Sequence, residues 1–383
     1  MVSRLCTSPR AVVVAASLML ATGVAGAQEI VVKVGVAAPL TGGGAAYGKD
    51  LQNGVQMAVD EANASHPTVG GKPVKFVVEA QDDQSDPRVG VQAAQRLVDD
   101  KVAFVIGHFN SGTTLPASQI YAKAGIAMIT PSATNPAITQ AGLKTVYRVI
   151  ATDAQNAGNA GAYAATVTKA KRIAIIDDRT AFGQGEADEF EKAVKANGGT
   201  IVDRQFTNDK AVDFSSQLTA IKSNNPDLVF FGGLDAQAAM LVKRMRQLGI
   251  KAQFLAGGGV MDANFIKLAG DAANGASVWE YGQPLASLPQ GNQFEAKFKQ
   301  KFGTDILAYA PFAYDATWIA IKAVENANSS APADINAALK TTSYDGITGK
   351  IAFTQTGDLK NPSSTLYQVK NDAWVPVTTK TGD

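Results

Sequence analysis

Hydrophobic residues in the first half of the chain form short continuous runs, and each run is followed by a longer amphipathic stretch. In the first stretch the apolar positions recur every three or four residues between Leu51 and Ala62, as on one face of a helix. The runs predict strands at 31–38, 74–80, 102–107 and 127–130. The stretches predict helices at 47–63, 87–100 and 115–124. Pro87 is well placed to open the second helix.

The second half repeats this alternation. Its predicted strands are residues 172–177, 200–206 and 227–233. Its predicted helices are residues 185–196, 214–223 and 236–248. Gly249 is suited to ending the last of these helices. Residues 290–340 are mainly helical in pattern, and 365–370 with 373–379 are predicted to end the chain as a strand pair.

The continuous apolar runs indicate the fold class. A strand that is apolar along its whole length is covered on both faces, as in a parallel sheet between helices. The two series, from about 30 to 150 and from about 170 to 280, therefore predict two α/β domains, each a mainly parallel sheet flanked by helices. A length of 383 residues suits two domains. Because no Gly/Ser-rich or Pro-rich linker separates the halves, we expect several chain crossings between them.

The first 27 residues have the pattern of a cleavable secretory signal. Arg4 and Arg10 make a basic start, residues 11–24 are apolar, and Ala25-Gly26-Ala27 offers small residues for cleavage after Ala27. The apolar part is too short for a bilayer, which needs roughly 20 residues. We therefore expect an exported protein that is not inserted in the membrane, and a periplasmic one if the cell is Gram-negative.

Cysteine content and charge fit that expectation. Cys6 is the single cysteine and would be removed with the signal, and a chain of this size needs no disulfide to stabilise its core. Removal of two arginines from the 35 Lys and Arg leaves 33, against 34 Asp and Glu. The chain has no basic run, so nucleic acid is not expected as a partner.

Residues 42–50, GGGAAYGKD, contain seven positions of the phosphate-binding loop G-x-x-x-x-G-K. The eighth position of such a loop is a Ser or Thr whose hydroxyl binds magnesium, whereas this chain has Asp50. A carboxylate there would lie beside the phosphates, and the dinucleotide pattern G-x-G-x-x-G is also absent from this turn. We interpret the stretch as a strand-to-helix turn whose backbone N–H groups face a crevice.

Catalytic and metal-binding patterns are weak. His66 and His108 do not belong to a ligand-spaced cluster. Ser111 follows His108 by three residues but lacks the flanking glycine of a nucleophile elbow. The acidic stretch 82–86 lacks the spacing and the final Glu of a calcium loop. We expect no catalytic residue, no metal and no cofactor.

Hydroxyl side chains follow two neighbouring predicted strands. Ligands of open α/β sheets bind at the carboxyl ends of strands, and helix N-termini attract anions. Single Ser and Thr residues at such places usually cap helices, but two hydroxyl turns beside the glycine-rich turn predict a carboxylate-binding pocket. The hydroxyl residues are Ser111, Thr113 and Thr114 in the first turn and Thr130, Ser132 and Thr134 in the second.

Nine motifs, in order, resemble those of the periplasmic leucine/isoleucine/valine-binding proteins of ABC transporters. The resemblance covers nearly the whole chain after the signal and implies a two-lobed type I fold that closes on its ligand by hinge motion. It implies one lobe from 28–150 plus 282–360 and another from 151–281 plus 361–383. The motifs are VGVAAPLTGGGAAYG, DDQSDP, VAFVIGHFNSGTTLPAS, ITPSATNP, RIAIIDDRTAFGQG, DFSSQL, DLVFFGGLDAQ, AYDA and GDLK.

The resemblance also implies which residues bind the ligand. It places the ligand carboxylate at Ser111 and at the turn formed by Ser132, Ala133 and Thr134. It places Tyr47 over the ligand and Tyr314 near the hinge. The pocket expected from the hydroxyl turns and the pocket implied by the family share Ser111 and Thr134.

Three departures from the family pattern affect the ligand. Phe182 stands where the family has a tyrosine, and Gly258 stands where the family has the acid that pairs the ligand ammonium. A buried ammonium without a partner costs several kcal/mol, so another acid replaces the missing one or the ligand has no ammonium there. Asp235 is the first candidate, with Asp262 and Glu280 behind it. The family disulfide is missing, since its positions are Ser85 and Asn110.

These observations favour a monomeric binding protein that captures an aliphatic or aromatic amino acid and delivers it to the membrane permease of an ABC transporter. Two alternatives stay open: the same role for a non-amino carboxylate such as an aromatic or keto acid, and a ligand-sensing receptor. A secreted hydrolase is disfavoured by the missing base and metal ligands.

Overall fold

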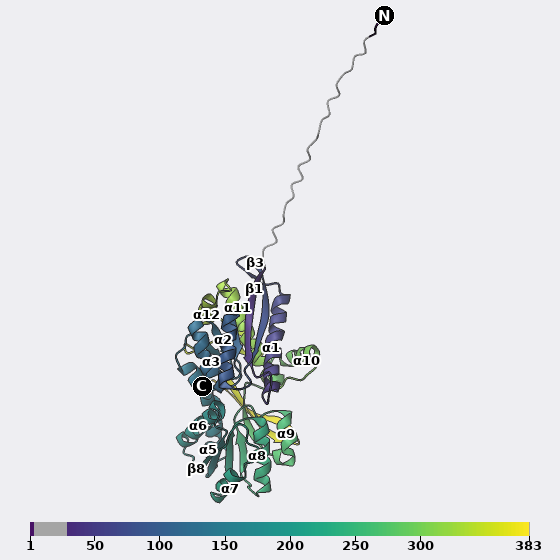
Figure 1. Cartoon of the computed structure of the whole chain (residues 1–383). Coiled ribbons are helices and arrows are strands. Elements are labelled where there is room, and N and C mark those ends of the chain that lie inside the picture. The colour runs from purple at the N-terminus through teal and green to yellow at the C-terminus, as the bar shows by residue number, and fades with distance from the viewer. Residues whose placement is uncertain (4–28, 383) are drawn as a thin grey trace.

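The structure is a computed structural model that describes residues 1–3 and 29–382. The expected signal segment and its cleavage position lie mostly outside the described residues. The described chain forms two α/β lobes, one above the other in Figure 1. We call the lobe that contains β1 (Ile30–Ala38) the first lobe and the lobe that contains β8 (Ile201–Phe206) the second lobe.

The first lobe is built on a six-stranded sheet. Its neighbouring strands are parallel except for β2 and β3, which are antiparallel. The strands, in spatial order, are β2 (Thr68–Val69), β3 (Lys72–Asp82), β1 (Ile30–Ala38), β4 (Phe104–Gly107), β5 (Ala127–Thr130) and β6 (Val146–Arg148). A separate short antiparallel pair consists of β12 (Tyr344–Asp345) and β13 (Lys350–Ile351).

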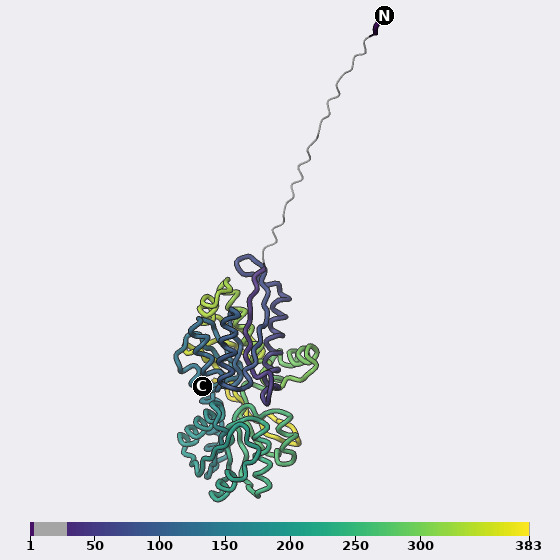
Figure 2. Tube along the Cα trace, viewed as in Figure 1, coloured from purple at the N-terminus to yellow at the C-terminus, as the bar shows by residue number. Residues whose placement is uncertain are grey.

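The second lobe is built on a seven-stranded sheet. Its central strands are parallel, and β14 and β15 add an antiparallel edge. The strands, in spatial order, are β15 (Ala373–Thr381), β14 (Ser363–Lys370), β11 (Ser277–Tyr281), β10 (Gln253–Ala256), β9 (Leu228–Gly232), β7 (Ile173–Asp177) and β8 (Ile201–Phe206). Figure 2 shows the yellow C-terminal segment joining this lower lobe.

Helices cover both faces of each sheet, as the continuous apolar runs predict. In the first lobe α1 packs on α11 and α2 packs on α3, and in the second α5 packs on α6 and α8 packs on α9. The helices of the first lobe are α1 (Ala45–Ala64), α2 (Pro87–Asp99), α3 (Ser111–Ala124), α4 (Ala137–Gln140), α10 (Gly291–Phe302), α11 (Ala310–Ala327) and α12 (Pro332–Leu339). Those of the second are α5 (Asp153–Thr166), α6 (Ala181–Ala196), α7 (Ser215–Ser223), α8 (Asp235–Gln247) and α9 (Ala263–Ala269).

Side chains alternate between the two faces of each sheet and build separate cores. On β4, Phe104 and Ile106 join the cluster under α1 and α11, whereas Val105 joins the cluster under α2 and α3. On β9, Phe231 and Phe230 divide in the same way between the two faces of the second sheet. This two-sided burial confirms the predicted class of mainly parallel sheets flanked by helices.

The chain passes between the lobes three times, after β6, after β11 and before β14. Most predicted helices lie within a few residues of the observed ones, and Pro87 opens α2 behind the N-cap Asp86. Two helices begin four residues earlier than predicted, at Ser111 and Ala181. The lobe limits at 150/151, 281/282 and 360/361 stay a prediction, with which the strand order is consistent.

Asp50, which breaks the phosphate-loop pattern, has a structural role. It lies on α1 with 5% of its surface exposed, and its carboxylate accepts hydrogen bonds from four successive backbone N–H groups at 2.7–3.1 Å. These belong to residues 307–310, at the start of α11. A carboxylate that accepts helix-terminal N–H groups is well stabilised, so Asp50 anchors α11 to α1.

We expect Asp50→Asn to destabilise the protein by about 2 kcal/mol, because the amide N–H₂ would face backbone donors and leave some of them unpaired. Urea unfolding would measure this change. Asp60→Asn is the matched control, since Asp60 lies on the same helix but is 41% exposed. Equal stability of the two variants would contradict the anchoring role.

Candidate functional site

The two hydroxyl turns of the first lobe meet at Ser111. Its Oγ accepts hydrogen bonds from the backbone N–H groups of Thr134 at 3.3 Å and Asn135 at 3.2 Å. Because these two N–H groups donate to the oxygen, the buried hydroxyl can still donate one hydrogen bond through its own proton. Ser111 is therefore not a helix cap; the residue before α3 is Asn110, whose side chain makes no capping bond.

The other hydroxyls mainly hold the backbone of the turns. Thr113 and Thr114 donate to the Asn110 carbonyl at 3.0 and 2.8 Å, which is a local helix interaction. Thr130 donates to the His108 carbonyl and accepts from Ala133 N–H. Ser132 donates to the Phe109 carbonyl at 3.0 Å. The turn is thus fixed from both strands and presents Ser111 and Thr134 together. The residues of the two turns that lie buried here are Ser111, Thr113, Thr114, Thr130, Ser132, Ala133 and Thr134.

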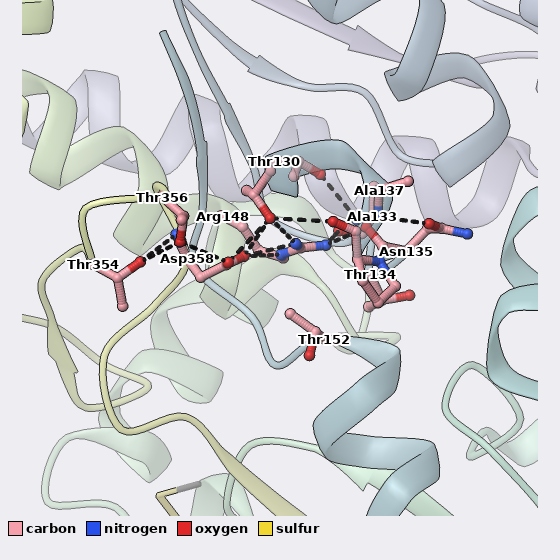
Figure 3. A network of polar contacts seen from close by, with 12 residues as sticks. Thr130, Ala133, Thr134, Asn135, Ala137, Arg148, Thr152, Thr354, Thr356 and Asp358 are labelled. Carbon is pink, nitrogen blue, oxygen red and sulfur yellow. Dashed lines mark hydrogen bonds and ion pairs between the residues drawn. The ribbon is translucent and has the colours of Figure 1, made fainter. Parts of the chain in front are cut away.

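Arg148, at the end of β6, fixes this turn from behind (Figure 3). Its fully buried guanidinium donates to the carbonyls of Ala133 and Asn135 at 3.1 and 2.9 Å. It also binds the carboxylate of Asp358 at 2.7 Å and the hydroxyl of Thr139 at 2.8 Å. Since Asp358 neutralises the guanidinium, Arg148 positions the turn and is not a free cation for a ligand.

Three aromatic rings of the first lobe form a cluster next to the hydroxyl turns. Tyr47 stacks on Phe109 with centroids 5.5 Å apart, and Tyr309 packs edge-on against both. Tyr47 also reaches the second lobe, because its hydroxyl donates to Asp235 Oδ1 at 3.0 Å. The opposite lobe adds Phe182 beside residues 257–259, which we call the glycine loop and where Gly259 has a positive φ of 78° that favours glycine.

A second bond crosses between the lobes at the hydroxyl turn. Asn135 Nδ2, in the first lobe, donates to the carbonyl of Ala181 at 2.6 Å, at the start of α6. The backbone N–H of Asp153, which opens α5, donates to the Thr134 carbonyl at 3.0 Å. The N-terminal ends of α3, α5 and α6 therefore converge on the turn that contains Thr134.

The second lobe contributes Glu186 through a gap left by Gly257 and Gly258. Glu186 Oε1 accepts from the Gly258 N–H at 2.9 Å and from the Tyr281 hydroxyl at 3.3 Å. A Cβ atom at Gly257 would lie 2.0 Å from Glu186 Oε1, and one at Gly258 would lie 2.0 Å from Tyr281 Cε2. The glutamate and the tyrosine thus fill the space that side chains at 257 and 258 would occupy.

Comparison with known proteins identifies the family. Residues 31–373 match the family described as periplasmic binding protein. The chain belongs to the periplasmic binding protein family. It is 33% identical to a Leu/Ile/Val-binding protein homologue of Brucella suis, over 94% of this chain and 95% of the relative. It is also 33% identical to a leucine-, isoleucine-, valine-, threonine- and alanine-binding protein of Pseudomonas aeruginosa, over 89% and 91%.

Solved structures agree with this assignment. The crystal structure of a leucine-binding protein, LivK, from Thermotoga maritima superposes with a TM-score of 0.83 at 30% identity, over 91% of this chain and 98% of that one. The two-lobed type I periplasmic-binding fold implied by the sequence motifs is thereby confirmed.

Most residues predicted for the site lie at the contact between the lobes. Tyr47 and Asp235 are joined by a hydrogen bond, and Ser111 with the turn 132–134 lies next to the Asn135–Ala181 bond. Phe182 lies beside the glycine loop that contains Gly258. The ligand-binding role of these residues stays a prediction, although the structure brings them into one region.

The structure does not bring Tyr314 to this group, which corrects the expectation for that residue. Tyr314 lies in the second turn of α11, its hydroxyl donates to Glu61 on α1, and its ring packs on Phe294 of α10. Tyr309, five residues earlier, stands at the N-terminal end of α11 and faces Tyr47 instead. The motif AYDA therefore marks the correct helix, but the ring beside the site belongs to the residue before that helix.

Asp235 also differs from its expected role as a free partner for an ammonium. Its Oδ1 accepts from Tyr47 and its Oδ2 from Asn264 Nδ2 at 3.2 Å. Asp262 caps α9 through Phe265 N–H, and Glu280 accepts from the N–H groups of Gly259 and Tyr281. All three candidate acids thus already have hydrogen-bond donors in the protein.

The sequence analysis did not select Glu186 as a site residue, although its position on the buried face of α6 sets it apart. The buried positions of α6 are Gly183, Glu186, Ala187, Phe190 and Val194, which make one helical stripe. An acid within such an apolar stripe is unusual, because a carboxylate is rarely buried without a partner. Three acids that are more exposed, Asp188, Glu189 and Glu191, follow it in the sequence GEADEFEK, so the pattern of charge alone does not single out Glu186.

Burial raises the pKa of several carboxyl groups around the contact. Desolvation raises the pKa of Glu186 well above its ordinary value, and the nearby Asp153 adds to this effect. Desolvation raises the pKa of Asp153 to about 7, while the nearby Thr134 hydroxyl and Arg148 offset part of the increase. The pKa of Glu280 and that of Asp262 are both raised to about 7, again mainly by burial.

His108 and Ser111 are not arranged as a catalytic base and nucleophile. Both ring nitrogens of His108 are engaged, by Asp83 at 2.8 Å and Tyr121 at 3.0 Å, so His108 does not serve Ser111 as a base. Within residues 1–3 and 29–382, we find neither a His, Cys, Asp and Glu group suited to a metal nor a helix long and apolar enough to span a membrane.

The raised carboxyl pKa values make stability depend on pH. A carboxyl group with a higher pKa in the folded state favours folding at low pH, and this contribution is lost as pH rises from the unfolded pKa toward the folded one. We expect the melting temperature of the ligand-free protein to fall between about pH 4.5 and pH 7, the interval up to the raised pKa of Asp153, Glu280 and Asp262. Thermal melts across this range would measure it, and Asp153→Asn should flatten part of the slope. A melting temperature that rises throughout, equally in the variant, would contradict this.

The tight fit around the glycine loop gives a separate prediction. We expect Gly258→Ala to destabilise the protein by about 2 kcal/mol, because the added methyl group would displace the ring of Tyr281. Gly158→Ala is the control, since Gly158 lies in α5 with no atom within 4 Å of an added Cβ and should be neutral or stabilising. Both variants would be compared by urea unfolding, and an unchanged stability of Gly258→Ala would show that Tyr281 does not restrict this position.

Proposed function

We propose that the protein is the extracytoplasmic solute-binding component of an ABC importer and that it binds an amino acid between its two lobes. Family membership and the names of the similar binding proteins support the transport role. The observation that carries the ligand class is the buried hydroxyl of Ser111, whose oxygen is occupied by Thr134 and Asn135 N–H and whose proton is left to donate. A carboxylate is the natural acceptor for such a donor at the end of a helix.

The proposed ligand lies with its carboxylate at Ser111 and the turn 132–134. Tyr47 and Phe182 would form walls around the side chain. Tyr309 replaces Tyr314 in this arrangement, because its ring packs on Tyr47 and Phe109. Apolar and aromatic walls with few polar groups suit an aliphatic or aromatic side chain.

The remaining parts of the proposal concern location and partners. The protein would act in the periplasm after removal of its signal, as a single copy that presents its ligand-bound form to a membrane permease. It would bind without transforming its ligand. The second candidate, the same role for a non-amino carboxylate, is favoured by Gly258, which supplies no acid for an ammonium. A ligand-sensing receptor remains a third reading of the same two lobes.

Thermal-shift measurements against amino acids and their deaminated analogues test the proposal. We expect at least one aliphatic or aromatic amino acid to raise the melting temperature, because a ligand that binds only the folded state stabilises it. Ser111→Ala should remove most of this shift. Ser118→Ala is the matched control, because Ser118 lies on the same helix and its hydroxyl donates to the Leu115 carbonyl.

Two results would contradict the proposal. A shift with deaminated acids alone would favour the second candidate. An equal shift in the Ser111→Ala variant would exclude Ser111 as the carboxylate site.

A further inference from the structure

Glu186 and its neighbour Asp153 differ from the other buried carboxyl groups of the described chain. The side chain of Glu186 is fully buried, Oε1 accepts from Gly258 N–H and Tyr281, and Oε2 has no hydrogen-bond partner among the described residues. In Asp153 beside it, neither oxygen makes a hydrogen bond of normal geometry in the same part of the chain, although the Thr134 hydroxyl is close enough to lower its pKa. A buried carboxylate that lacks a partner is costly.

Elsewhere the fold supplies donors to its buried acids. Asp50 accepts four backbone N–H groups, and Asp315 accepts two together with the Thr348 hydroxyl. Asp177 is paired with Arg204. Against this background the unfilled oxygen of Glu186 indicates a partner from outside the chain.

A cation is the partner that two adjacent acids attract most strongly. The only buried Lys or Arg side chain among residues 1–3 and 29–382 is Arg148, and its guanidinium is already bound to Asp358. Two neighbouring carboxylates without a counter-ion repel each other and raise their own pKa, whereas an ammonium between them would relieve both effects.

The position of this pair fits the proposed anion site. The Asp153 carboxylate lies against α6 at Gly185, where an added Cβ would be 2.8 Å from Oδ2 and 2.7 Å from Asn135 Nδ2. Asn135 N–H in turn binds Ser111 Oγ. A site for negative charge and a site for positive charge therefore lie next to each other, as the carboxylate and ammonium of an α-amino acid do.

We propose that Glu186, with Asp153 beside it, receives the ammonium group of the ligand. The inference rests on the proposed function and resolves the problem set by Gly258, because the acid comes from α6 and reaches the same loop through the gap at Gly257. It makes the protein selective for ligands that carry an ammonium over deaminated acids of the same shape.

Capture of an ammonium by this pair has a consequence for protons. The groups that face Glu186 are Asp153 from α5, Glu280 and Tyr281 from β11, and the Gly258 N–H from the loop after β10. Because burial and the neighbouring acids favour the protonated form of Glu186, an incoming ammonium displaces a proton into solvent. Binding of an amino acid near neutral pH therefore releases protons.

The experiment compares Glu186→Gln with the unaltered protein by isothermal titration calorimetry. The probes are the amino acid with the largest thermal shift and its deaminated analogue. Replacing one partner of a buried charge pair typically weakens binding by about 100-fold, and we expect this loss for the amino acid and none for the analogue. Glu191→Gln is the matched control, since Glu191 lies on the same helix and pairs with Lys195 and Arg204 on the outer face.

The outcomes separate the inference from the proposed function. If the unaltered protein binds no amino acid, the proposed ligand class fails. If it binds one and Glu186→Gln binds it equally well, the ligand class stands and the role of Glu186 is wrong. Titration of the unaltered protein in buffers of different ionisation enthalpy tests the inference even if the variant misfolds. Proton release near pH 7 supports it, and binding without proton release overturns it.

Discussion

A pair of buried carboxyl groups that lack hydrogen-bond donors, at the contact between the lobes, is the constraint on which the proposed site depends. The fold can bury carboxylates cheaply where backbone N–H groups converge, as they do around Asp50. Between α5, α6 and β11 it does not, and Glu186 and Asp153 remain short of donors. A protein tolerates such a region when a bound cation completes it. In the proposed site, these oxygens therefore gain partners only when a ligand with an ammonium group binds, and this requirement would make the site specific for such ligands.

The glycine loop after β10 makes this arrangement sterically possible. With Gly257 and Gly258 lacking side chains, Glu186 and Tyr281 occupy the space from the neighbouring helix and strand. On the opposite lobe, Arg148 and Asp358 hold the hydroxyl turn in place. Neither of these two side chains is proposed to contact the ligand. In the proposed site, one wall therefore donates hydrogen bonds and the other is acidic, which is the arrangement that the two charges of an amino acid require.

The sequence predicted the fold almost completely, because continuous apolar runs and helical periodicity are local signals. It also located the Ser111 turn, since strand ends of a parallel sheet meet at one edge. It could not show that Asp235 is occupied by Tyr47, or that Tyr309 and not Tyr314 faces the site, because these depend on how α1, α8 and α11 are oriented. The sequence also could not show that Glu186 lies next to position 258, because the two positions are 72 residues apart in the chain and meet only in the folded structure.

The two bonds between the lobes, Tyr47 to Asp235 and Asn135 to the Ala181 carbonyl, use only groups of the protein. Neither requires a ligand, so each stabilises joined lobes whether the site is filled or empty. Such bonds raise the population of ligand-free protein with joined lobes, and they reduce the share of binding free energy spent on moving the lobes. For the proposed membrane permease, the same bonds would reduce the structural difference between ligand-bound and ligand-free protein, so the permease would bind ligand-free copies more often.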